Sequence, residues 1–168
     1  MATLLRFLRL LAVVVWVGGV IFFAFILAPV AFHLLPSQHE AGIVIGGTLR
    51  VLDVIGLVCG GIFWIATLVL TLRSNRSARG RFNAQLLLAA FMLLATAYLH
   101  MGILPAMEIA RAEAGGNIES SPASDPAHIE FERLHKRSER VEGAVLFCGL
   151  GIVVLMARES LPSNTVNS

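Results

Sequence analysis

The chain has 168 residues, of which 57% are hydrophobic and only 14% are charged, and its formal net charge is +2. Soluble domains are about half apolar and about a quarter charged, so this composition exceeds what one soluble core can bury. Four apolar segments are each long enough to cross a hydrocarbon layer of about 30 Å. The composition therefore excludes an ordinary soluble domain and predicts an integral membrane protein in contact with the lipid bilayer.

The first two spans are expected to form a hairpin with a very short turn. The first is longer than the apolar region of a cleaved signal peptide, so we expect it to remain in the protein. Pro29 is expected to kink this helix near its end. Ser37, with Glu40 three residues later, forms a capping box that begins the second helix. At about 1.5 Å per residue, the second helix is longer than the membrane is thick and must tilt or project.

Proline and glycine mark the boundaries of the last two helices. Pro105 is expected to break or kink the third helix, and Gly115 with Gly116 ends its short amphipathic continuation. After a serine-rich loop, Asp125 followed by Pro126 is typical of an N-cap with proline at the first helical position. The fourth helix is therefore expected to begin there.

These signals together predict the fold class. We expect an all-α, antiparallel four-helix membrane bundle whose long helices project beyond the outer membrane face. The whole of residues 1–158 is expected to be one four-span domain, followed by a polar tail at 159–168. The expected spans are residues 4–35, 38–73, 81–104 and 126–157.

The charges are distributed unequally between the two sides of this bundle. One side carries ten acidic and six basic residues, and the other carries seven basic residues and one acidic residue. The latter group consists of Arg6, Arg9, Arg73, Arg76, Arg79, Arg81, Arg158 and Glu159. The positive-inside rule then places both termini in the cytoplasm, in the cell inner (plasma) membrane. These few scattered arginines indicate topology and not nucleic-acid binding.

Polar residues inside the spans mark the candidate site. Residues 130–157 read EFERLHKRSERVEGAVLFCGLGIVVLMA, a charged helix that continues into an apolar one. Ionisable groups at membrane depth are costly, so they need partners, and Arg50 is expected to pair with Asp53 one turn away. The residues predicted to form an outward-facing ligand or ion site are Arg50, Asp53, His100, His135, Glu139, Arg140 and Glu142.

Several interpretations of these residues remain open. One interpretation is an interhelical salt-bridge network that sets helix register, and another is a site that handles a ligand or ion. Carboxylates and imidazoles suit zinc or copper(II), and methionines suit copper(I), but no H-x-x-H or C-x-x-C spacing occurs, so the metal is unknown. A b-type haem would use two of His33, His100 and His135. Glu139 and Glu142 have no accompanying nucleophile, which favours a protein that is not an enzyme.

Small residues indicate where helices pack closely. Two glycines after Trp16, followed by Phe22, suggest a close crossing on the first helix, and the second helix carries glycines four residues apart. The residues predicted to mediate packing are Gly18, Gly19, Gly42, Gly46, Gly56 and Gly60.

These motifs resemble a known family. The matching residues are Trp16-x-Gly18-Gly19 with Phe22, Gly42 and Gly46 after the Pro36 turn, Gly102 with Pro105, and Leu134-His135-x-x-Ser138-x-Arg140-x-Glu142-Gly143. Over about residues 4–158 the chain is similar to the transmembrane protein 205-like family, also called domain of unknown function 4149. The resemblance implies a four-span membrane protein, and the association of eukaryotic relatives with resistance to platinum drugs hints at metal or drug handling.

The sequence thus leads to three functional hypotheses. The first is a membrane protein that binds or passes an ion, metal or small solute at an outward-facing polar site. The second is a structural or assembly subunit of a larger membrane complex, in which glycine faces contact partner helices or a second copy of the chain. The third is a haem-bearing membrane redox subunit.

Overall fold

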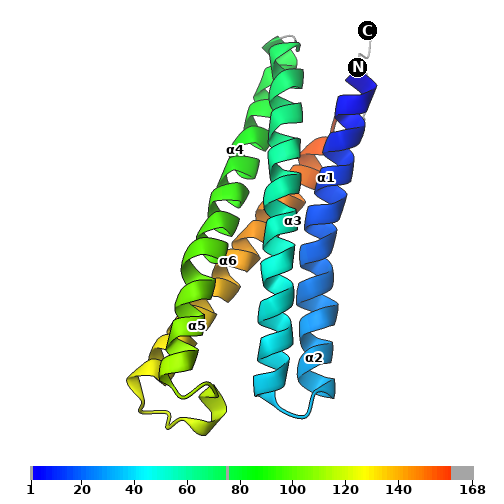
Figure 1. The fold of residues 1–168 in the computed structure, drawn as a ribbon. Coiled ribbons are helices and arrows are strands. Elements are labelled where there is room, and N and C mark those ends of the chain that lie inside the picture. The colour runs from blue at the N-terminus through cyan, green and yellow to red at the C-terminus, as the bar shows by residue number, and fades with distance from the viewer. Residues whose placement is uncertain (1, 75, 160–168) are drawn as a thin grey trace, which may run out of the picture.

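The computed structural model describes residues 2–74 and 76–159, and over these residues the fold is a bundle of helices (Figure 1). The predicted all-α membrane bundle is confirmed, while residues 160–168, most of the predicted polar tail, lie outside the described residues. The elements in chain order are α1 (Ala2–Phe22), the π-helical η1 (Phe23–Leu27), α2 (Ala28–Leu34), α3 (Gln38–Leu72), α4 (Arg76–Tyr98), the π-helical η2 (Leu99–Ile103), α5 (Leu104–Glu113), the 3-10 helix η3 (Ile118–Ser120) and α6 (Pro126–Ala157).

Helices α3 and α6 begin, and α5 ends, at the residues that the sequence predicts. The Ser37 hydroxyl accepts a hydrogen bond from the Glu40 N–H at 3.1 Å, and the Asp125 carboxylate accepts one from the Ala127 N–H at 2.9 Å. At the end of α5, Gly115 has a φ of +83°, and the N–H of Gly116 donates to the Arg111 carbonyl at 2.9 Å. Only glycine adopts this left-handed backbone without strain, which explains why the helix stops there.

Pro29 and Pro105 do not break the helices in which they lie. Each is preceded by one widened π-helical turn, in which a backbone N–H bonds the carbonyl five residues earlier: Ala28 to Phe23 and Leu104 to Leu99. Pro29 and Pro105 each follow that N–H by one residue. Because proline has no N–H and crowds the preceding turn, the widened turn accommodates it while the helix continues. Of the break or kink expected at Pro105, the break does not occur, because the helix continues through α4, η2 and α5.

The helices alternate in direction, and α6 crosses behind the others (Figure 1). We call the end with the start of α1, the α3–α4 connection and the end of α6 the terminal end. The opposite end, with the connections at residues 35–37 and 114–125, is the loop end. Helix α3 packs between α1 and α4, whereas α6 packs against α5 near the loop end and against α4 and α1 further along. Because α6 leans toward α5, it diverges from α2 near the loop end.

The centre of the bundle is held by a tryptophan that fits against glycines. Trp16 of α1 is 3% exposed, and a Cβ added at Gly56 or Gly60 of α3 would lie 2.4 or 2.5 Å from its indole ring. Glycine therefore provides the space that the ring occupies between α1 and α3. Gly149 of α6 makes a similar close approach, because a Cβ there would lie 2.7 Å from Val17.

The outside of the bundle is apolar over most of its length. Four helical segments are long and apolar enough to span a membrane: Thr3–Leu34, Gln38–Leu72, Arg79–Glu113 and Pro126–Ala157. Many large apolar side chains point outward, among them Phe25 at 68% and Leu94 at 73% exposure. Such a surface is stable against lipid and not against water, so the protein is an integral membrane protein.

Candidate functional site

A cavity of about 460 Å³ lies between the α2–α3 hairpin and the α5–α6 pair. It occupies the space that opens where α6 leans away from α2. Its mouth at the loop end is polar, with His39, Asn117 and Glu119, and its depth reaches Val20 and Leu146. The volume is within the range of about 300–1,000 Å³ that is typical of sites for small organic ligands.

The walls combine apolar and acidic side chains. Aromatic rings come from α2, η1 and α6, namely Phe32, Phe23 and Phe131. The ionisable residues that line the cavity are His39, Arg50, Glu108, Arg111, Glu119, Glu132, His135, Glu139 and Glu142. Carboxylates therefore outnumber guanidinium groups, and both guanidinium groups are bound to the same carboxylate.

That carboxylate belongs to Glu108, which lies between two arginines. Arg50 is 3.6 Å and Arg111 is 3.3 Å from its Oε1. The predicted pairing of Arg50 with Asp53 is thus wrong. The Arg50 side chain, 47% exposed, reaches across the cavity to α5, whereas Asp53, one turn deeper on α3, faces the interior of the bundle.

The partner of Asp53 is His100, the first polar residue of η2. The Asp53 side chain is 6% exposed, and its Oδ2 lies 3.7 Å from Nδ1 of His100. This distance is too long for a hydrogen bond, and both atoms are buried without a hydrogen-bond partner. Two buried polar atoms that face each other unsatisfied are costly, and such residues inside membrane bundles commonly mark ion or proton sites.

A second, much smaller cavity of about 20 Å³ lies next to Asp53, and we call it the inner chamber. Glu142 lines both this chamber and the wide cavity, as do Val20, Phe23 and Leu49. Among the described residues the Glu142 carboxylate has no ion pair or hydrogen bond. The structure thus brings Asp53, His100 and Glu142 to neighbouring positions from three helices.

The remaining predicted site residues lie nearer the mouth or outside. Nε2 of His135 lies 3.4 Å from Oε1 of Glu139, and the imidazole stacks on the ring of Phe131. Both His135 and Glu139 line the wide cavity. Arg140 is exposed and is not among the cavity-lining residues. His33, considered above as a haem ligand, is also exposed on α2 and does not line the cavity.

The four glycines of α3 that were predicted to mediate packing divide into two groups. Gly56 and Gly60 pack against Trp16, and on α1 a Cβ at Gly19 would lie 2.7 Å from Leu52. Gly42 and Gly46 instead line the wide cavity, and a Cβ at Gly46 would meet no atom within 4 Å. The expected close packing is therefore not observed at Gly46, nor at Gly18, whose Cβ would also meet no atom within 4 Å.

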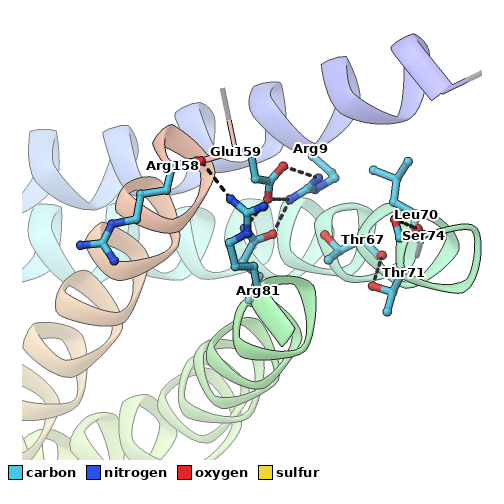
Figure 2. Close-up of polar contacts among 9 residues, drawn as sticks. Arg9, Thr67, Leu70, Thr71, Ser74, Arg81, Arg158 and Glu159 are labelled. Carbon is cyan, nitrogen blue, oxygen red and sulfur yellow. Dashed lines mark hydrogen bonds and ion pairs between the residues drawn. The ribbon is translucent and has the colours of Figure 1, made fainter. Parts of the chain in front are cut away.

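A third polar group, at the terminal end, was missed by the sequence analysis. Arg9, interpreted above only as an indicator of membrane topology, is 1% exposed. Its guanidinium donates a hydrogen bond to Glu159 at 3.1 Å (Figure 2). It also donates to the Gln85 side chain and lies over the rings of Phe63 and Phe82. The helical period contains the signal, because Arg9 shares the face of the core residues Ala12, Val13 and Trp16.

Thr96 was also missed, since a single threonine in an apolar helix carries no pattern. It is 3% exposed and lines the inner chamber together with Asp53 and Glu142. Within the described part of the chain, no three His, Cys, Asp or Glu residues are grouped so that they could hold a metal ion.

The fold and the cavity define a four-span integral membrane protein with acidic groups in its interior. The chain belongs to the family described as domain of unknown function DUF4149, whose family model matches residues 11–115. The match includes α3, both π-helical segments, and Glu108 with its two arginine partners, Arg50 and Arg111. It ends before α6 begins. No curated protein and no solved structure matches the chain.

Proposed function

We propose that this protein binds a small organic cation in the wide cavity. The observation that supports the proposal is a space of about 460 Å³ in which carboxylates outnumber guanidinium groups. Glu139 is near only an imidazole, His135, and Glu142 has no partner among the described residues. A positively charged solute would supply the charge that these carboxylates lack.

The proposed solute has an apolar body as well as a positive head. Most of the wall is aliphatic or aromatic, and Phe23, Phe32 and Phe131 surround the space. An ammonium group attracts both carboxylates and aromatic faces, while its hydrocarbon part gains from leaving water. A primary amine with an aromatic tail fits this chemistry better than a metal ion or an anion does.

The cavity is proposed to open away from the cytoplasm. The arginines at residues 6, 9, 73, 79, 81 and 158 belong to the start of α1, the α3–α4 connection and the end of α6, which form the terminal end. Short basic segments of membrane proteins remain on the cytoplasmic side. Under this proposal both termini are cytoplasmic in the inner (plasma) membrane. The loop end, with the polar mouth of the cavity, then faces outward and takes its solute from outside.

The test uses three compounds of the same shape and different charge: 4-phenylbutylamine, 4-phenylbutanol and 4-phenylbutyrate. Binding to the protein purified in mild detergent is measured by equilibrium dialysis and by the rise in thermal unfolding temperature. Unit charges about 6 Å apart interact with about 3 kcal/mol at an effective dielectric constant of about 20. We therefore expect the amine to bind at least about tenfold more tightly than the alcohol, and the carboxylate to bind weakest.

Two variants test the location of binding. Gly46→Leu should fill the cavity without a clash, because a Cβ at Gly46 meets no atom within 4 Å, and it should abolish amine binding. Glu139→Gln should weaken amine binding about tenfold while leaving the alcohol unaffected. The matched controls are Gly61→Leu, which points away from the cavity, and Glu130→Gln on the same face of the membrane.

Equal affinity for the amine and the alcohol would refute the cation proposal. Binding that survives Gly46→Leu would refute the location. If no compound binds and another membrane protein purifies with the chain in fixed ratio, the subunit hypothesis replaces this one.

A further inference from the structure

The inner chamber has the composition of a site for a small inorganic cation. Its volume of about 20 Å³ is close to the space that a single water molecule needs. Three oxygen-bearing side chains line it, from three different helices: Asp53 of α3, Thr96 of α4 and Glu142 of α6. The rest of the wall is apolar, apart from the Trp16 indole.

The charges around the chamber do not balance. Asp53 and Glu142 contribute two carboxylates. Among the described residues, the only basic side chain in an ion pair with either is His100, whose Nδ1 lies 3.7 Å from the Asp53 carboxylate. With both carboxylates ionised, two negative charges are uncompensated if His100 is neutral, and one is uncompensated if His100 is protonated. Asp53 is 95% buried, and its Oδ2 has no hydrogen-bond partner. Uncompensated charge at this depth is costly, so the chamber favours a bound cation.

The size and the donors of the chamber select a particular class of cation. Calcium takes six to eight oxygen ligands, and magnesium usually keeps several waters, so both need more donors or more room than the chamber has. An organic ammonium ion is too large for about 20 Å³. We propose that Asp53, Glu142 and Thr96 form a binding site for a dehydrated monovalent metal ion of the size of sodium.

The ion would enter from the wide cavity. Glu142 lines both spaces, so its carboxylate can follow an ion from the larger space into the smaller one. On the other side, Trp16 closes the chamber, because its ring is packed against Gly56 and Gly60 of α3. Under this proposal the ion reaches the chamber from the loop end and not from the terminal end.

The experiment measures thermal unfolding in detergent at fixed pH and fixed ionic strength, with sodium chloride exchanged for caesium chloride. No organic cation is present, so the result is independent of the solute proposed for the wide cavity. We expect the unfolding temperature to rise with sodium and to saturate, to respond less to potassium, and not to respond to caesium. Binding of ²²Na⁺ to the purified protein measures the same site directly.

Variants separate binding from folding. Asp53→Asn and Glu142→Gln remove one negative charge each and should lower sodium affinity at least about tenfold. Because a buried substitution can disturb folding, Thr96→Val provides a second test: it keeps the shape, removes one oxygen donor, and should weaken sodium binding severalfold. Thr48→Val is the matched control, since the Thr48 hydroxyl bonds the Val44 carbonyl and lines neither cavity.

Three results would overturn the proposal. One is equal stabilisation by sodium and caesium, which would show that the chamber does not select an ion of the size of sodium. Another is sodium binding that Thr96→Val and Asp53→Asn both leave unchanged. The third is a folded protein that binds no ²²Na⁺ at all and whose stability changes only with pH, which would make the chamber a proton site.

Discussion

Gly60→Ala is the substitution for which the structure makes the sharpest prediction. A Cβ at this position would lie 2.5 Å from Cζ3 and 2.8 Å from Cη2 of Trp16, and 2.7 Å from Cδ2 of Leu93. The leucine methyl can rotate away, but the indole is rigid, 3% exposed, and enclosed between α1 and α3. The added methyl group must therefore push the two helices apart or displace the ring.

The next residue provides the matched control. A Cβ at Gly61 would meet no atom within 4 Å. Replacing glycine by alanine in a helix stabilises it by about 0.5–1 kcal/mol, and this gain should appear at Gly61. At Gly60 the same gain is opposed by an overpacking cost of about 1–3 kcal/mol. We expect Gly60→Ala to be less stable than Gly61→Ala by about 2 kcal/mol.

Unfolding of the detergent-solubilised protein, followed by circular dichroism during titration with a denaturing detergent, measures this difference. A double-mutant cycle with Trp16→Leu identifies its cause, because removal of the ring should cancel most of the cost of Gly60→Ala. If Gly60→Ala and Gly61→Ala have the same stability, the close contact between Trp16 and Gly60 does not hold α1 to α3. A cost that persists without the ring would assign the effect to Leu93 instead.

Two further substitutions test the ends of the helices. Arg9→Met removes the guanidinium from Gln85 and Glu159, which then keep only the hydrogen bond between their own side chains. We expect a loss of about 2–3 kcal/mol, because the partly exposed Glu159 carboxylate is also solvated, which relieves part of the usual cost of about 3–5 kcal/mol. The same assay should show a change below about 0.5 kcal/mol for Arg6→Met, whose side chain is exposed, and equal effects at the two arginines would contradict the buried contact. Asp125→Ala removes the N-cap of α6 and should cost about 1 kcal/mol, whereas Asp125→Ser should restore most of the loss; no loss with alanine would exclude a contribution from the cap.

Local features of the fold were predictable because their causes are local. Ser37 and Asp125 cap the helices that follow them, and Gly115 ends α5, since each acts on backbone groups within a few residues. Length and apolarity likewise identify the spans, because a membrane helix must satisfy its own backbone and present apolar side chains to lipid. The effect of Pro105 was less predictable, because the widened turn at η2 is one of several ways to accommodate a proline.

The candidate site was predictable only as a set of residues. That Asp53, His100 and Glu142 require partners follows from the cost of polar groups at membrane depth. Their arrangement does not follow, because it depends on how α3, η2 and α6 cross. Arg50 is one turn from Asp53, yet the tertiary structure directs it to Glu108 on α5 and leaves Asp53 beside His100.

The sequence by itself determined the class of protein, the four spans, the helix caps and the presence of buried ionisable groups, since all of these depend on composition and on interactions between near neighbours. Only the tertiary structure decided that α6 leans toward α5 and opens the wide cavity, that Gly46 faces this cavity while Gly60 packs against Trp16, and that Arg9 is buried. The physical reason is that the crossing and rotation of helices result from packing summed over many contacts between residues that are distant in sequence. No single segment of the sequence therefore determines them.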